Sequence, residues 1–213
     1  DDPGPLKDRF AAEAKALGFG TQGIVMLAAQ RNLAVILLQE RLNFGVAVRC
    51  ALEIARCIAH MHEKGVVHRD IKPSNLLINH SGAVKVSDFG IVREMEDASM
   101  ANTFVGTLSY MSPERIAGNS YAYPSDIWSF GLTILTVALG RYPYSTDGGY
   151  WGLLHSLRDE PSPHLPDDGS FSRNFQDFVD SCLRKDPAER PSTQKLLHHP
   201  FLIGCKENME AQR

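Results

Sequence analysis

Four residues of the chain carry side chains that could act on a phosphate group. Asp70, Lys72 and Asn75 lie within six positions of one another, and Asp88 follows 13 positions after Asn75. Phosphoryl transfer needs a carboxylate near the attacking hydroxyl, oxygen ligands for magnesium and a positive charge on the transferred group. A single Asp is more often a turn or cap residue. The set can act only if the elements around it bring its members together.

The segment between Asn75 and Asp88 has the composition of a β-hairpin. Residues 76–78 and 83–86 are apolar runs, and residues 79–82, Asn-His-Ser-Gly, suit a four-residue hairpin loop. Such a hairpin returns its two ends to one place. We therefore expect Asn75 and Asp88 to lie side by side.

Most of the chain beyond this region has helical character. Four segments have the periodicity or composition of α-helices: 46–62, 125–139, 175–183 and 193–198. The second of them is apolar nearly all round, with Ser125-Asp126 expected as its cap and Gly140 as its stop. Residues 14–38 instead read as strands around a glycine-rich turn, with a second hairpin turning at Arg31-Asn32.

Composition narrows the functional classes. The chain has 213 residues, 43% of them hydrophobic, and a net charge of -3, far from the basic balance that a nucleic-acid partner requires. The four cysteines form no Cys-x-x-Cys pair that would suggest zinc or a redox centre. No run reaches the roughly 18 apolar residues of a membrane-spanning helix. We expect no nucleic-acid or membrane partner, and a cytoplasmic or nuclear location.

Three motifs, in order and at ordinary spacing, resemble the signature of eukaryotic protein kinases. Residues 68–75 read His-Arg-Asp-Ile-Lys-Pro-Ser-Asn, residues 88–90 read Asp-Phe-Gly, and residues 112–114 read Ser-Pro-Glu. With three motifs in register, isolated turn residues no longer explain the pattern.

The resemblance implies a role for each candidate residue. Asp70 is expected to position and deprotonate the substrate hydroxyl, and Lys72 to contact the γ-phosphate of ATP. Asn75 and Asp88 are expected to hold Mg²⁺. Lys72, together with Thr107, resembles Ser/Thr-type kinases rather than dedicated tyrosine kinases.

Residues 99–115 closely resemble the activation segment of MAP kinase kinases. The resemblance implies that an upstream MAP kinase kinase kinase phosphorylates Ser99 and Thr103, and that a downstream MAP kinase is the substrate. Each phosphate adds roughly two negative charges, for which Arg69 is the expected acceptor. The alternative is a solvated loop that happens to contain Ser and Thr.

Three further residues match architectural positions of the family. Glu114 and Arg190 match a buried ion pair that ties the activation segment to the helical lobe. Asp126 matches a residue that caps its helix and braces the backbone of residues 68–75.

A glycine-rich segment resembles the loop that covers nucleotide phosphates in kinases. Its matching residues are Gly18, Gly20, Gly23 and Val25, the last expected to pack on the adenine. A hairpin that binds nothing is the common explanation of an isolated match. The motifs downstream favour nucleotide binding.

The small-lobe pattern is incomplete after this loop. The best match to the family's third strand places Ile36 where the phosphate-binding lysine is expected, and no lysine occurs between Lys15 and Lys64. Alternatively, residues 35–40 are the strand that enters the hinge, and everything from the third to the fourth strand is missing. The lysine is absent in either alignment.

The sequence thus predicts an α+β, protein-kinase-like two-lobe fold. The expected units are a small-lobe remnant at 1–41, a mainly α-helical large lobe at 42–202 and a C-terminal tail at 203–213. The predicted function is an ATP- and Mg²⁺-dependent Ser/Thr or dual-specificity kinase of MAP kinase kinase type. One alternative is a truncated kinase or pseudokinase that acts as a binding module in a MAP kinase pathway. Another is an incomplete gene product whose full form is an ordinary kinase.

Overall fold

The computed structural model of the protein describes residues 30–32, 44–79, 84–87, 109–145 and 148–204. Its helices and 3₁₀ turns are α4 (Phe44–Glu63), η1 (Pro73–Asn75), α6 (Pro113–Ile116), α7 (Tyr123–Leu139), α8 (Gly149–Asp159), α9 (Arg173–Cys182), η2 (Pro187–Glu189) and α10 (Thr193–Leu197). Its strands are β1 (Gln30–Asn32), β2 (Leu76–Asn79) and β3 (Val84–Val86). A further helical segment begins at Pro200. The mainly helical structure with a small sheet confirms the predicted fold class. The boundary at residue 42 stays a prediction.

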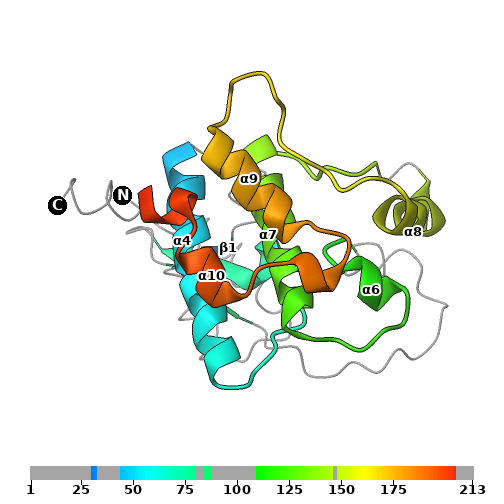
Figure 1. The fold of residues 1–213 in the computed structure, drawn as a ribbon, viewed down its shortest axis with the longest axis horizontal. Coiled ribbons are helices and arrows are strands. Elements are labelled where there is room, and N and C mark those ends of the chain that lie inside the picture. Colours follow the sequence, from blue (N-terminus) through cyan, green and yellow to red (C-terminus); the bar gives the residue numbers. More distant parts are fainter. Residues whose placement is uncertain (1–29, 33–43, 80–83, 88–108, 146–147, 205–213) are drawn as a thin grey trace, which may run out of the picture.

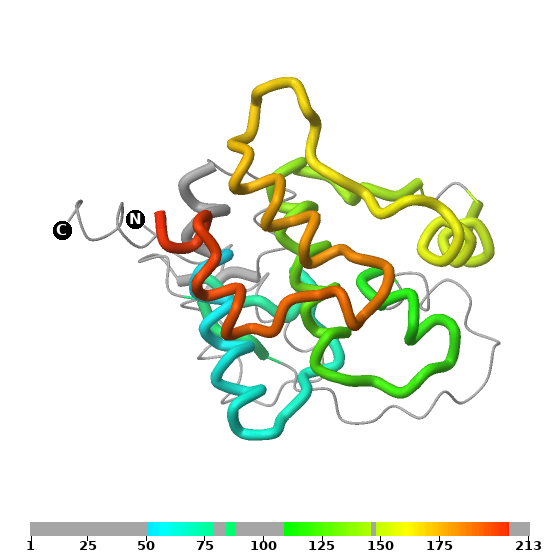
Figure 2. Tube along the Cα trace, viewed as in Figure 1, coloured from blue at the N-terminus to red at the C-terminus, as the bar shows by residue number. Residues whose placement is uncertain are grey.

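The helices are arranged around α7, which lies in the middle of the molecule (Figure 1). It contacts α4 and α9. The long helix α4 also contacts α10, so segments from opposite ends of the described chain lie side by side (Figure 2). Helices α6 and α8 contact each other at the far side of α7 from α4.

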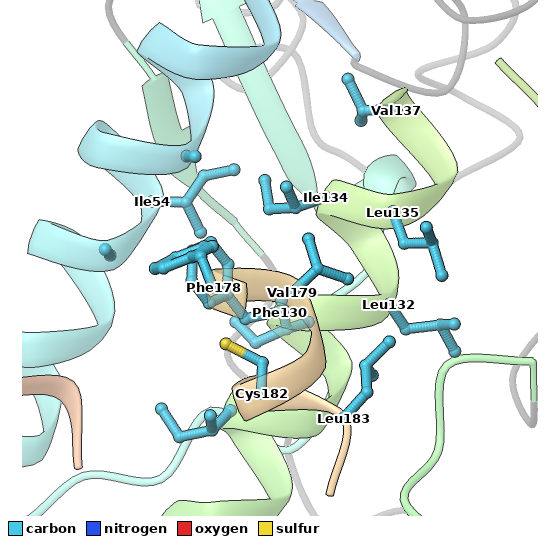
Figure 3. Close-up of a cluster of buried hydrophobic side chains, with 14 of the residues drawn as sticks. Ile54, Phe130, Leu132, Ile134, Leu135, Val137, Phe178, Val179, Cys182 and Leu183 are labelled. Atoms are coloured by element: carbon cyan, nitrogen blue, oxygen red, sulfur yellow. The ribbon is translucent and has the colours of Figure 1, made fainter. Parts of the chain in front are cut away.

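The central position of α7 follows from its sequence, which is apolar on every side. All of its residues from Ser125 to Val137 are buried. Figure 3 shows the cluster that joins Ile54 of α4, Phe130 of α7 and Phe178 of α9. The rings of Phe130 and Phe178 meet edge to face, with centroids 5.9 Å apart. Each such side chain contributes about 1.5–3 kcal/mol on burial. No helix in the described ranges is both long and apolar enough to cross a membrane.

The close approach of α7 to α9 requires a glycine. A Cβ at Gly131 would lie 2.5 Å from the Cβ of Cys182. Any larger residue at this position would force the two helices apart.

The helix ends agree with the sequence in part. Gly140 ends α7 in the left-handed conformation, with φ of 66°, as predicted. The predicted cap at Ser125-Asp126 is wrong, because α7 begins at Tyr123, with Ala122 at the cap position and a proline in the first turn. A proline there lacks only an N–H that would have no partner in the helix. Ser125 and Asp126 therefore do not cap the helix, and their side chains contact other segments instead.

The sheet contains one predicted and one unpredicted pairing. Strands β2 and β3 form the expected antiparallel hairpin, with Leu76 opposite Val86. Strand β1 pairs antiparallel with the other edge of β2, with Arg31 opposite Ile78. The turn predicted at Arg31-Asn32 is therefore wrong. The backbone of this segment finds its partners on the free edge of β2, which the local pattern does not reveal.

Candidate active site

The loop of residues 68–75, which follows α4, brings three predicted site residues together. Lys72 Nζ lies 2.8 Å from Asp70 Oδ2. Asn75 Nδ2 donates to the same oxygen at 2.9 Å, and to the backbone carbonyl of Asp70 at 2.8 Å. No described residue donates to Asp70 Oδ1. One oxygen of the carboxylate therefore remains available to accept a hydrogen bond from an incoming hydroxyl.

The 3₁₀ turn η1 explains why Asn75 reaches back to Asp70. Pro73 occupies its start, where a missing N–H costs little. The N–H of Asn75 then donates to the carbonyl of Lys72 at 2.9 Å. The tight turn places the Asn75 side chain, only 5% exposed, against the residue five positions earlier.

Asn75 can offer one oxygen to a cation. Its Nδ2 uses both hydrogens on Asp70, so the other arm of the amide presents the acceptor oxygen Oδ1. Amide and carboxylate oxygens are the ligands that Mg²⁺ prefers. Asp88 itself lies outside the described residues, but the N–H of Ser87 donates to the carbonyl of Asn75 at 2.8 Å. The hairpin thus returns the chain to Asn75 one residue before Asp88. Within the described ranges, no three His, Cys, Asp or Glu side chains form a metal-binding cluster.

The backbone of the 68–75 loop is held by Asp126, a fully buried carboxylate of α7. Its Oδ2 accepts the N–H of His68 at 2.8 Å, and its Oδ1 accepts the N–H of Arg69 at 2.9 Å. These contacts confirm the predicted brace. His62 Nε2 lies 3.0 Å from Oδ2, and the Tyr121 hydroxyl donates to Oδ1 at 3.1 Å. Four partners satisfy the buried carboxylate, as a buried charge requires.

Three residues at this site were not found from the sequence: His62, Tyr121 and Arg115. His62 stands 64 positions from Asp126. Arg115 donates through Nη1 to the carbonyl of Arg69, 46 positions away, at 2.8 Å. Burial, reinforced by the nearby carboxylate, raises the pKa of Tyr121 well above its ordinary range, so its hydroxyl stays a neutral donor. No local pattern marks such residues, because their partners are distant in the sequence.

Arg69 combines a strained backbone with an exposed side chain. Its φ of 73° lies in the left-handed region, which costs a non-glycine residue about 1–3 kcal/mol. Its guanidinium makes no hydrogen bond or ion pair with any described residue. An exposed guanidinium of this kind can receive an anion. The residues expected to provide one, Ser99 and Thr103, lie outside the described ranges.

The predicted ion pair between Glu114 and Arg190 is confirmed. Arg190 Nη1 and Nη2 each donate to one carboxylate oxygen at 2.8 Å, and Ser125 Oγ donates to Oε1 at 2.8 Å. The Arg190 side chain is fully buried. Burial by itself would raise the pKa of Glu114, but the hydrogen bonds and charge of Arg190 outweigh it, so this pKa lies below its ordinary value. The pair ties α6 to the helical core.

The other predicted site residues lie outside the described ranges: Gly18, Gly20, Gly23, Val25, Asp88, Ser99 and Thr103. Their roles stay predictions.

Comparison with known proteins agrees with this geometry. A family model described as Protein kinase domain matches residues 24–202. The chain belongs to the protein kinase family. Within that family it resembles MAP kinase kinases, which confirms the resemblance seen in its motifs.

Three similar kinases illustrate the relationship. Mitogen-activated protein kinase kinase 2 of Arabidopsis thaliana is 49% identical over 148 residues, which cover 66% of this chain and 40% of the relative. Mitogen-activated protein kinase kinase 1c of Physcomitrium patens is 47% identical over 165 residues, which cover 74% of this chain and 47% of the relative. MAP kinase kinase MKK1/SSP32 of Saccharomyces cerevisiae is 40% identical over 186 residues, which cover 81% of this chain and 36% of the relative. The chain thus spans less than half the length of each relative.

Proposed function

We propose that this chain is a protein kinase of MAP kinase kinase type, which transfers the γ-phosphoryl group of ATP to a hydroxyl of a downstream MAP kinase. One observation carries the proposal. Lys72 and Asn75 both meet Oδ2 of Asp70, which leaves Oδ1 available for a substrate hydroxyl. The family of the chain, and the names of its relatives, support this class of reaction over a docking module without activity.

In this proposal the substrate oxygen attacks the γ-phosphorus, the bond to the bridging oxygen of ATP breaks, and ADP leaves. Asp70 orients the hydroxyl through Oδ1 and receives its proton. Lys72 keeps a positive charge beside the reacting group while it holds the carboxylate in place. Mg²⁺, with Asn75 and Asp88 as its protein ligands, would neutralise phosphate charge when bound.

The proposal includes control by phosphorylation. An upstream MAP kinase kinase kinase would modify Ser99 and Thr103, and the phosphates would pair with Arg69. The exposed guanidinium of Arg69, which pairs with no described residue, supports this role. A phosphate there would sit directly beside the residue that carries the catalytic carboxylate.

Single-turnover transfer from radiolabelled ATP to a kinase-dead MAP kinase tests the function. The chain is compared with Asp70→Asn and with the matched control Asp167→Asn, which changes an exposed Asp far from the site in the sequence. Loss of the general base should lower the rate by about 10²- to 10⁴-fold. The control should transfer phosphate at the unchanged rate. If the unchanged chain transfers phosphate no faster than Asp70→Asn does, the result counts against the proposal.

A further inference from the structure

The peptide that joins Arg69 to Asp70 is held at both ends. Its carbonyl accepts a hydrogen bond from Arg115 Nη1 at 2.8 Å. Its N–H, which belongs to Asp70, donates to Nδ1 of His68 at 3.3 Å. This peptide carries the Cα of Asp70, so its orientation sets the direction in which the carboxylate points. These two contacts restrict rotation of the peptide plane.

The contact from Arg115 acts where the backbone is strained. Arg69, with φ of 73°, adopts a conformation that non-glycine residues rarely take. Its N–H is fixed by Asp126 Oδ1 at 2.9 Å. Without a partner for its carbonyl, the following peptide plane could rotate toward a relaxed conformation. Arg115 supplies that partner.

Arg115 is itself held in place by a second contact. Its guanidinium lies over the ring of Tyr121, 4.8 Å from the centroid. The Tyr121 hydroxyl donates to Asp126 Oδ1, the same oxygen that accepts the N–H of Arg69. The contacts therefore close a ring that runs from Arg115 through Arg69, Asp126 and Tyr121. Each member restricts the movement of the next.

The position of α6 connects this ring to the core. Glu114, the neighbour of Arg115, pairs with the buried Arg190. One residue of this short helix thus anchors it to the helical lobe, and the next reaches the loop that bears Asp70. The helix follows residues 88–108 in the chain, after a short stretch that ends at Ser112.

We infer that Arg115 is a positioning residue for phosphoryl transfer, which orients Asp70 by fixing the peptide between Arg69 and Asp70. The inference rests on the proposed function, in which Asp70 accepts the proton of the substrate hydroxyl. A planar guanidinium can stack on a ring and donate in its own plane at once. An ammonium provides the charge and N–H donors, but it has no plane that can stack on the ring.

The kinetic test uses two changes at Arg115 and one matched control. Arg115→Met removes the donors and the charge but keeps a long side chain, and Arg115→Lys keeps the charge and a donor. Arg141→Met removes an exposed arginine that takes no part in the ring of contacts around Arg69. We expect Arg115→Met to lower kcat about tenfold, equivalent to about 1.4 kcal/mol. The KM values for ATP and the MAP kinase should stay within about twofold, because a misdirected general base affects turnover more than binding.

Lysine should restore part of the lost turnover, and Arg141→Met should match the unchanged chain. Equal kcat in the Arg115→Met and Arg141→Met variants would overturn the inference. A fall in kcat that follows a lowered thermal midpoint, and that lysine does not reverse, would show a structural role only. That result would overturn it as well.

Amide hydrogen exchange gives a readout that does not depend on catalysis. The N–H groups of Arg69 and Asp70 should exchange faster in Arg115→Met than in Arg141→Met, with the buried amides of α7 unchanged. If the chain shows no transfer that depends on Asp70, the proposed function fails, and exchange still decides whether Arg115 holds the peptide. Equal exchange in the two variants would refute the structural basis of the inference.

Discussion

Removing the charge of Glu114, whose side chain is 9% exposed, should destabilise the protein more than the same change at an exposed glutamate. The Arg190 side chain is fully buried, and Glu114 accepts one hydrogen bond from each of its terminal nitrogens at 2.8 Å. In Glu114→Gln one of these nitrogens faces an amide NH₂ instead of an oxygen. A buried guanidinium is then left without its counter-charge.

The magnitude follows from what remains around Arg190. Breaking a buried pair by removing one partner costs about 3–5 kcal/mol. Here three backbone carbonyls, those of Pro124, Arg184 and Lys185, still accept from the guanidinium. The lower end, about 3 kcal/mol, is therefore expected. With a urea dependence of about 2 kcal/mol per molar, the unfolding midpoint should fall by about 1.5 M.

Urea unfolding followed by tryptophan fluorescence measures this change. The indole of Trp128 lies 5.1 Å from the Arg190 guanidinium, so its emission reports on the pair. Trp151 is 75% exposed and can be replaced by Phe in all variants to remove its signal. Glu189→Gln, an exposed glutamate next to Arg190 in the sequence, is the matched control and should leave the midpoint unchanged.

A double variant tests the cause. Glu114→Gln combined with Arg190→Met removes both charges, so its loss of stability should be smaller than the sum of the two single losses. Midpoints for Glu114→Gln and Glu189→Gln that agree within error would refute the reasoning. Strict additivity in the double variant would refute the assignment of the loss to an unpaired charge.

Three further predictions concern pH, helix packing and rate. Because the pKa of Glu114 is lowered in the folded state, its pair with Arg190 stabilises the fold fully above about pH 4.5, and less as acid protonates the folded carboxyl. The unfolding free energies of the unchanged chain and of Glu114→Gln should therefore converge as the pH falls. Divergence in acid would contradict an ionised pair. Gly131→Ala should lower the unfolding free energy by about 1–3 kcal/mol. The matched control is Gly152→Ala, whose Cβ would meet no atom within 4 Å, and which should be neutral or stabilise α8 by about 0.5–1 kcal/mol in thermal unfolding. Equal effects of the two variants would exclude the clash between residue 131 and Cys182. The chain lacks the small-lobe lysine, so its single-turnover transfer should be far slower than that of a version with a complete small lobe grafted before residue 42. Equal rates for the two proteins, both abolished by Asp70→Asn, would mean that another residue replaces the lysine.

The local parts of the site were predictable because they are short-range. Asp70, Lys72 and Asn75 lie within one loop and one 3₁₀ turn, so their order in the chain largely decides their contacts. The hairpin of β2 and β3 was predictable for the same reason, since a four-residue loop pairs neighbouring strands.

The elements that failed depend on partners elsewhere. Arg31-Asn32 has the composition of a turn, yet it forms a strand because the edge of β2 offers backbone groups to it. Ser125-Asp126 has the composition of a cap, yet Ser125 donates to Glu114 and Asp126 holds the 68–75 loop. A polar side chain near a helix start has several possible partners, and distant segments decided between them.

By itself, the sequence determined the residue types that can handle a phosphate, their order, and the helices and hairpin that carry them. Periodicity and turn composition are properties of neighbours, and the chain's own order is enough to express them. Only the tertiary structure decided how the backbone that carries Asp70 is held. The peptide before it is held by Arg115, and the loop by Asp126, across 46 and 58 positions of sequence. Such contacts form only after α6 and α7 pack beside the loop, because a single directed hydrogen bond needs both partners placed by the surrounding fold.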